Sequence, residues 1–320
     1  MIKVGILGAD NLKAGELIRI LIHHPEVEIT TLYSPENAGR KASSIHHGLI
    51  GEEIVNFSDQ IDFLSLDIIF IANDRIPLKT IMEEVDKNEE NKAKIIDLSE
   101  SKIDALLVEQ LSTGLSEINR KELVRGADRA RVLPSAVVLT LIALYPFAAN
   151  LLLPRTINID VAAPKDIIDS FDYNEVAFNI KRELHKVQKS FDGQLDLKAI
   201  ANKSERVMRI KISFKSRIEI GEILKLYESI YDDHNFVFFS LSEADGREME
   251  GTHKTLVQIS KPDPDECRLE IIGDCRLRGG AGDAVHIMNL FFALYEKIGL
   301  TFKPSSYGQN EESASRPAGW

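Results

Sequence analysis

The first hundred residues alternate short apolar segments with helical ones, and this alternation most limits what the chain can fold into. Segments that predict strands lie at residues 2–8, 27–34, 67–73 and 93–99. Residues 12–24 predict a helix that ends before Pro25 and places Leu17, Ile20 and Leu21 on one face. Strands that alternate with helices in this way predict βαβ units and a parallel sheet.

After about residue 155, strands follow one another with few helices between them. Ile210, Ile212 and Phe214 alternate with polar or charged side chains, which predicts a half-buried antiparallel strand. We therefore predict an α/β fold of two domains. They are a Rossmann-type parallel-sheet domain at residues 1–153 and an α+β second domain at residues 154–278, followed by a disordered tail at residues 308–320.

The composition excludes several classes of partner. The 320 residues carry a net charge of −11, whereas a protein that binds nucleic acid needs a basic face. Cys267 and Cys275 do not suggest a disulfide framework, and the N-terminus lacks the basic region of a secretory signal, so we expect a cytoplasmic protein. The adjacent histidines at 23–24 and 46–47 do not face one another on a helix, so we expect no metal site.

Residues 132–153 are long and apolar enough to suggest a membrane span. Pro134 and Pro146 interrupt them, and polar side chains are interspersed. A helix that is apolar all round is usually a core helix in a large protein. We therefore expect a buried helix here and no association with a membrane.

A glycine-containing loop lies between the first strand and the first helix, where a dinucleotide fingerprint belongs. Gly8 and Gly15 fit that fingerprint, and Asn11 stands where a further glycine is expected. Asparagine can replace glycine there, because it tolerates positive φ better than most residues. The second strand ends at Ser34, and Glu36 follows where an acid would repel a 2′-phosphate. These five residues are candidates for cofactor binding; a Rossmann-like turn that binds no cofactor is the alternative.

Several stretches together resemble the N-acetyl-gamma-glutamyl-phosphate reductase family of semialdehyde dehydrogenases. They lie at residues 1–10, 14–29, 37–39, 94–99, 114–120 and 279–294. The resemblance implies NADPH-dependent reduction of an acyl phosphate to a semialdehyde, through a thioester on a cysteine and with a histidine handling protons. It also implies that a helix at residues 279–307 completes the first domain, and it adds Gly279 and Gly282 to the cofactor-binding candidates.

The chain departs from the family pattern at the residues that carry this chemistry. The family's cysteine falls on Ser135, and a hydroxyl is a far weaker nucleophile than a thiolate unless a base activates it. Residues 173–177, YNEVA, hold no histidine, and His185 falls within the helix that follows. The glycine-rich loop of the second domain is shortened, and the arginine that usually follows the Asp-Leu-Ser turn is missing. Cys275 and Asp283 replace the family's asparagine and glutamine.

Two further candidates have both a functional and a structural interpretation. Glu117, Asn119 and Arg120 match a family pattern that either binds a ligand or stabilises a domain-joining loop. Cys275 is either a relocated nucleophile or a buried thiol that packs as a small apolar side chain.

We predict a catalytically inactive homologue of the reductase that acts as a regulatory or assembly partner. The alternatives are an active NAD(P)-dependent acyl-phosphate or semialdehyde oxidoreductase in which Ser135 or Cys275 has a changed role, and a nucleotide or metabolite sensor. We expect NAD(P) to bind weakly and without preference for NADPH. We also expect a homo-oligomer, or a hetero-oligomer with a catalytic relative, because residues 235–241, NFVFFSL, are apolar on both faces.

Overall fold

The computed structural model describes residues 1–100, 105–242 and 244–305. The chain divides into two compact units. Unit 1 holds residues 1–138 and 276–301, and unit 2 holds residues 139–275 together with the C-terminal residues from 302. The tail that the sequence predicts at residues 308–320 lies outside the described residues.

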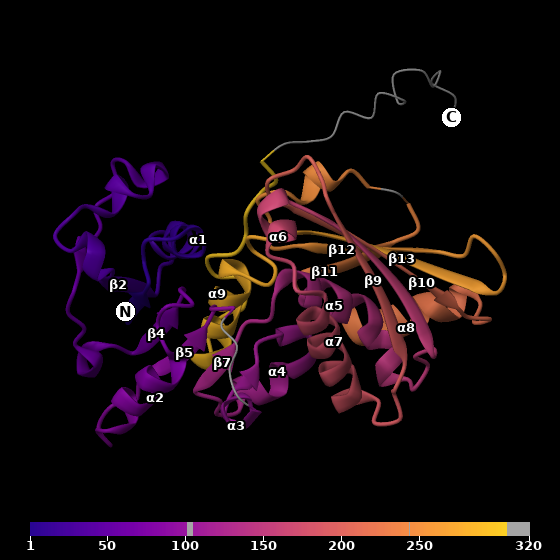
Figure 1. Ribbon diagram of the computed structural model, residues 1–320, viewed down its shortest axis with the longest axis horizontal. Coiled ribbons are helices and arrows are strands. Elements are labelled where there is room, and N and C mark those ends of the chain that lie inside the picture. Colours follow the sequence, from indigo (N-terminus) through magenta and orange to yellow (C-terminus); the bar gives the residue numbers. More distant parts are fainter. Residues whose placement is uncertain (101–104, 243, 306–320) are drawn as a thin grey trace. The chain divides into compact units, whose positions relative to one another are not determined.

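A seven-stranded parallel sheet forms the centre of unit 1 (Figure 1). Its spatial order is β3 (Phe57–Ser58), β2 (Val27–Tyr33), β1 (Ile2–Leu7), β4 (Ile68–Ile71), β5 (Lys94–Asp97), β7 (Arg129–Arg131) and β6 (Ser112–Thr113). The helices of the unit are α1 (Leu12–Leu21), α2 (Leu78–Asp86), α3 (Ala105–Val108), α4 (Ser116–Val124) and α9 (Ala281–Phe291). This arrangement confirms the Rossmann-type α/β prediction.

The strand order of this sheet reverses between β1 and β4, because β2 and β3 lie on one side of β1 and the later strands on the other. In Rossmann-type sheets, ligands bind beyond the carboxyl ends of the strands at such a reversal. Short 3₁₀ turns in unit 1 lie at Pro35–Asn37, Ala42–Ser44, His47–Leu49 and Phe63–Ser65.

The C-terminal helix of unit 1 packs against α1 and α4. It spans Ala281–Phe291 and is shorter than the segment 279–307 that the sequence suggests. It ends because Ala293 has a φ of 52°, a left-handed conformation that a right-handed helix cannot continue.

The two units meet in the sequence within α5 (Ser135–Ala149), earlier than the predicted boundary at residue 153. The first turn of α5 belongs to unit 1, where Gly279 lies directly against the backbone of Ser135. The rest of α5 packs in unit 2, where the rings of Phe147 and Phe214 meet edge to face at 5.0 Å. The boundary therefore falls where the packing partners of the helix change.

A six-stranded mixed sheet forms unit 2. Its order is β11 (Val237–Ser240), β12 (Thr255–Ser260), β13 (Glu266–Asp274), β10 (Val207–Lys215), β8 (Thr156–Ala163) and β9 (Gln194–Ala201). The outer pairs β11–β12 and β8–β9 are parallel, and the inner pairs are antiparallel. The helices that follow α5 are α6 (Lys165–Asp169), α7 (Tyr173–Val187) and α8 (Ile220–Tyr231), and a 3₁₀ turn lies at Gly246–Met249.

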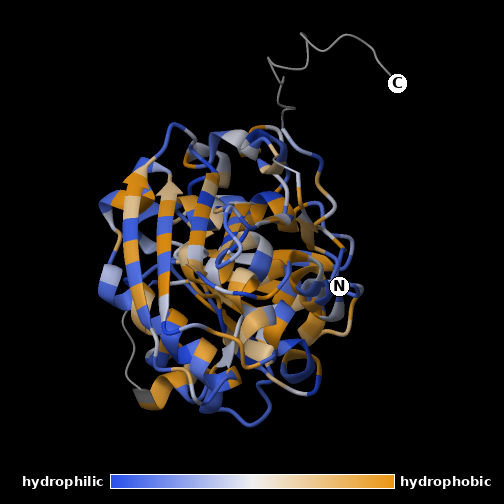
Figure 2. Ribbon diagram, turned by 90° about the vertical axis from the view of Figure 1, so that its right-hand side faces the viewer, coloured by the Kyte–Doolittle hydropathy of each residue, from blue (hydrophilic) through white to orange (hydrophobic). Residues whose placement is uncertain are grey.

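The alternation predicted for β10 is present in the structure. Ile210, Ile212 and Phe214 are buried, whereas Lys211 and Lys215 are exposed. Figure 2 shows the same alternation of hydrophobic and hydrophilic residues along strands of this sheet. One face of the sheet therefore carries the core of unit 2.

Pro146 interrupts the hydrogen bonding of α5, because proline has no N–H to donate to the carbonyl of Ile142 four residues earlier. The hydroxyl of Tyr231, from α8, donates to that carbonyl at 2.6 Å. The hydroxyl of Tyr227 donates to the neighbouring carbonyl of Ala143 at 2.5 Å.

Among the described residues, α5 included, no helix combines the length and the apolar character that crossing a membrane requires.

The apolar segment that suggests an interface forms β11, at the edge of the sheet. Val237 is buried, and the ring of Phe239 lies 5.8 Å from that of Tyr227, so this face packs within the unit. Phe238 is 45% exposed on the other face. An oligomer through this strand stays a prediction.

Candidate cofactor and reaction site

The loops after β1 and β4 touch at the reversal of the strand order. Gly8 has a φ of 74°, which favours glycine, and a Cβ placed there would lie 2.2 Å from the Cβ of Asn73. Asn73 follows β4. Gly8 is therefore required for the close approach of two loops of this chain.

Asn11 joins the same two loops through its side-chain amide. Its Nδ2 donates to the carbonyl of Ala72 at 2.6 Å and to that of Gly8 at 3.2 Å. Its Oδ1 accepts the N–H of Ala14 at 2.9 Å, so Asn11 is the N-cap of α1. Its φ is −112°, and the positive φ that the sequence suggested is not used, because N-cap residues have extended backbone.

Gly15 makes room for a histidine that covers the loop. A Cβ at Gly15 would lie 2.7 Å from Nδ1 of His46, and Nε2 of His46 donates to the carbonyl of Ala9 at 2.7 Å. This ring nitrogen is therefore bound to the backbone of the β1–α1 loop. The space that glycine leaves in a dinucleotide fingerprint is here occupied by a side chain of the protein.

The carboxylate of Asp10, which is not among the sequence-based candidates, lies at the end of β2. Oδ2 of Asp10 accepts from Oγ of Ser34 at 3.0 Å and from Nδ2 of Asn37 at 3.1 Å. Glu36 is exposed and pairs with Arg75 at 3.4 Å. The contact between Asp10 and Ser34 is invisible in the sequence, because the two residues are 24 positions apart and meet only through the pairing of β1 with β2.

These contacts bear on whether a nucleotide with a 2′-phosphate fits this edge of the sheet. Ser34 and Asn37, the uncharged donors at the end of β2, already donate to Asp10. Asp10 and Glu36 place two carboxylates where a 2′-phosphate needs cations. Two arginines also lie here, since Arg75 pairs with Glu36 and Arg40 donates to Asn37.

Ser135, the candidate reaction residue, opens α5 and is 8% exposed. Gly279 has a φ of 70°, and a Cβ placed there would lie 2.4 Å from the backbone N and Cα of Ser135. The N–H of Gly279 donates to Oδ2 of Asp283 at 2.6 Å. Gly279 is therefore needed for the tight packing of its loop on α5. Gly282 is buried in the first turn of α9.

A completely buried arginine, absent from the sequence-based candidates, holds this loop. Arg278 contacts Glu117 at 2.7 Å and Asp283 at 3.1 Å. Burial raises the pKa of Asp283 to about 6 despite the nearby guanidinium. Burial would also raise the pKa of Glu117, but Arg278 and His286 outweigh it and hold that pKa below its usual value.

A second buried network joins α4 to the segment after α9. Nδ1 of His286 lies 2.8 Å from Oγ of Ser116, and its Nε2 lies 3.0 Å from Oε2 of Glu296. Nε of Arg120 donates to Oε1 of Glu296 at 2.6 Å. The hydrogen bond from His286 lowers the pKa of Glu296 to about 2. Glu117 and Arg120 thus stabilise unit 1 internally, which favours the structural interpretation of their motif.

Asn119, the third residue of that motif, lies at a kink in α4. Its Nδ2 donates to the carbonyl of Thr113 at 3.3 Å. It also lines a surface hollow of about 560 Å³, together with Ile118, Lys121, Glu122 and residues 125–127. None of the cofactor-binding candidates lines this hollow.

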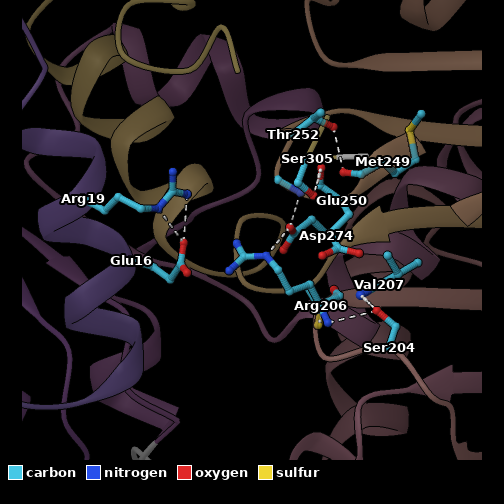
Figure 3. A network of polar contacts seen from close by, with 12 residues as sticks. Glu16, Arg19, Ser204, Arg206, Val207, Met249, Glu250, Thr252, Asp274 and Ser305 are labelled. Carbon is cyan, nitrogen blue, oxygen red and sulfur yellow. Dashed lines mark hydrogen bonds and ion pairs between the residues drawn. The ribbon is translucent and has the colours of Figure 1, made fainter. Parts of the chain in front are cut away.

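In unit 2, Cys275 follows β13, is 4% exposed, and donates its thiol to the carbonyl of Arg206 at 2.9 Å. Oδ2 of the neighbouring Asp274 accepts from Nε of Arg206 at 2.8 Å and from the N–H of Gly251 at 2.7 Å (Figure 3). The N–H of Ser305 donates to the carbonyl of Glu250 at 3.0 Å. This network ties four segments of unit 2 together, and it favours a structural role for the thiol.

His185 lies within α7, as the sequence predicts, and its Nδ1 is 3.3 Å from the carbonyl of Phe191. The YNEVA segment forms the start of this helix and does not precede it, because Asp172 caps the helix. Oδ1 of Asp172 accepts the N–H groups of Asn174 and Glu175.

Comparison with known proteins finds one matching family model and relatives that match nearly the whole chain. The family described as "Semialdehyde dehydrogenase, NAD binding domain" matches residues 3–125. N-acetyl-gamma-glutamyl-phosphate reductase of Bacteroides thetaiotaomicron is 31% identical over 96% of this chain and 100% of the relative. The corresponding protein of Parabacteroides distasonis is 30% identical with the same coverage.

Solved structures share the fold at low sequence identity. Aspartate semialdehyde dehydrogenase II from Vibrio cholerae, complexed with ASA, has a TM-score of 0.67 and 14% identity, and the match covers 92% of this chain and 99% of that one. Aspartate semialdehyde dehydrogenase with NADP from Candida albicans has a TM-score of 0.62 and 13% identity, over 93% and 99% of the two chains.

Proposed function

The chain belongs to the N-acetyl-gamma-glutamyl-phosphate reductase family, and from this premise we propose that it is a regulatory or assembly homologue that does not carry out the reduction. The observation that carries the proposal is Ser135. It opens α5 at the position where the resemblance places the family's cysteine.

The chemistry implied for the family needs a good nucleophile at this position. A thiolate attacks an acyl phosphate and forms a reactive thioester, whereas a serine hydroxyl ionises far less readily and its ester holds the acyl group less reactively. The residues before and at the start of α7, 171–177, contain no histidine that could act as the base. These two substitutions together remove nucleophile and base, which supports a binding role.

The first unit belongs to a family described as NAD-binding, so we also propose that it binds NAD(P) weakly and without preference for NADPH. Asn11 bridges the loops after β1 and β4, and Glu36 follows β2, where an acid would repel a 2′-phosphate. The match to a family described as NAD-binding, together with the reversal of strand order between β1 and β4, favours a nucleotide sensor as the second candidate function. In that case nucleotide binding, and not a protein partner alone, would carry the function.

The test is turnover by the purified chain. N-acetyl-gamma-glutamyl phosphate and NADPH are mixed with the protein, NADPH oxidation is followed by absorbance, and the reverse reaction is run with the semialdehyde and phosphate. We expect no rate above that of Ser135→Ala, and none for Ser135→Cys, because a thiol alone lacks its base. Turnover of about 1–1000 per second that Ser135→Ala abolishes would show that the chain is a reductase.

We propose that the chain self-associates, or pairs with a catalytic relative, through the exposed face of β11. Light scattering at micromolar concentration, alone and with an active reductase of the same cell, measures the mass. Phe238→Asp alters the exposed face and should give a monomer, whereas Phe239→Asp would disturb packing against Tyr227. Phe178→Asp, at a 62% exposed position on α7, is the matched control and should leave the mass unchanged. A monomeric wild-type chain in both samples would contradict the proposal.

A further inference from the structure

Asp10 forms a closed triangle of polar contacts with the end of β2. Its Oδ2 accepts from Ser34 at 3.0 Å and from Asn37 at 3.1 Å. Nδ2 of Asn37 also lies 3.0 Å from Oγ of Ser34. Ser34 is buried, at 3% exposed, whereas Asp10 and Asn37 are partly exposed. The carboxylate is thus fixed in place and remains accessible from one side.

The triangle lies at the end of β2, which is where Rossmann-type sheets bind the adenosine ribose of a dinucleotide. In Rossmann-type sheets an acidic residue at the end of the second strand accepts the adenosine ribose 2′-hydroxyl, whereas a cation there accommodates a 2′-phosphate. Here the residue after β2 is Ser34, and the carboxylate comes from the β1–α1 loop. Asp10 therefore places an acceptor at the end of β2 from a different element.

The charged groups that contact Asn37 or flank it at Glu36 carry both signs. Glu36 pairs with Arg75, and Nη1 of Arg40 donates to Oδ1 of Asn37 at 2.8 Å. With Asp10 included, these four charged groups sum to zero. A 2′-phosphate beside Asp10 would meet a like charge, and the uncharged donors Ser34 and Asn37 already serve the carboxylate.

We propose that Asp10 is a specificity-determining residue that selects adenine nucleotides with a free ribose 2′-hydroxyl and rejects those with a 2′-phosphate. Ser34 and Asn37 are positioning residues, because they hold the carboxylate through its Oδ2 and leave Oδ1 to accept the ribose hydroxyl. Selection of this kind requires that this edge of the sheet binds a nucleotide, as proposed above. It does not require that the chain reduces anything.

The experiment measures binding alone, with probes that lack the nicotinamide ring. Isothermal titration calorimetry compares ADP-ribose with 2′-phospho-ADP-ribose on the wild-type chain, on Asp10→Asn and on Asp128→Asn. Asp128 is an exposed carboxylate of the same unit, so this variant makes the same change in net charge away from the triangle. Circular dichroism verifies that each variant is folded.

We expect the wild-type chain to bind ADP-ribose at least about tenfold more tightly than its 2′-phosphate. Asp10→Asn should reduce that ratio by about tenfold, since an amide is uncharged and accepts more weakly, and Asp128→Asn should leave it unchanged. Equal or tighter binding of the 2′-phosphate by the wild-type chain, an unchanged ratio in Asp10→Asn, or no measurable binding of ADP-ribose would each overturn the inference. Turnover is measured separately, so an active reductase that still selects ADP-ribose would contradict only the proposed function.

Discussion

The hydroxyl of Tyr231 supplies the hydrogen bond that Pro146 cannot donate within α5, and its contribution to the free energy of unfolding can be measured. Ile142 and Tyr231 are both buried, so Tyr231→Phe leaves the carbonyl of Ile142 without its donor at 2.6 Å. An unsatisfied buried carbonyl costs about 1–3 kcal/mol. We expect Tyr231→Phe to lower the free energy of unfolding of unit 2 by that amount.

The matching change is Pro146→Ala, which restores an N–H four residues after Ile142. In that background the helix supplies the donor itself, and Tyr231→Phe should cost only about 0.5 kcal/mol. The double-mutant cycle should therefore give a coupling energy of about 0.5–2.5 kcal/mol between the two positions.

Tyr227→Phe is the control, because its acceptor, the carbonyl of Ala143, lies four residues before Phe147, which has an N–H. Its cost should change by less than about 0.5 kcal/mol between the two backgrounds. Urea unfolding followed by far-ultraviolet circular dichroism provides the free energies. Equal costs of Tyr231→Phe with proline and with alanine at position 146 would refute the explanation.

Two further predictions concern unit 1. Gly279→Ala should lower the stability of unit 1 more than Gly39→Ala does. Both glycines have positive φ, which costs alanine about 1–2 kcal/mol. Only a Cβ at Gly279 meets backbone atoms, and this overpacking adds about 1–3 kcal/mol. Equal melting temperatures would contradict this. The pKa of Glu296 lies near 2 instead of 4.5, so its contribution to stability is complete above pH 4.5 and is lost toward pH 2. Glu296→Gln should therefore flatten the acid limb of the stability profile, and an unchanged limb would exclude the pairing with His286.

The backbone of the first unit follows from local patterns in the sequence. The apolar segment at residues 67–73 contains β4, whose four residues are all buried, and Leu17, Ile20 and Leu21 are buried on α1 as their spacing predicts. Such patterns report which face of one element is apolar. They also led to the parallel sheet, because strands and helices alternate along the chain.

The polar contacts of the site could not be predicted in the same way. Asp10 and Ser34 meet because β1 and β2 pair in a register that shifts between Val4 and Gly5. Arg278 appears in the sequence as an ordinary charged residue, and its partner Glu117 is 161 residues away. Long-range pairs of this kind depend on the assembled fold, so a single sequence carries no local signal for them.

The two buried thiols make the chain a convenient background for site-specific labels. Cys267 is inaccessible to solvent and burial raises its pKa to about 12, so at pH 7 about one molecule in 100,000 carries the reactive thiolate there. Cys275 is 4% exposed, and its sulfur is bound to the backbone. Cysteines introduced at exposed positions such as Asp128 in unit 1 and Lys189 in unit 2 would therefore take up paired spin labels or dyes without removal of either native thiol. Distances between such labels would follow the two units as a nucleotide or a partner is added.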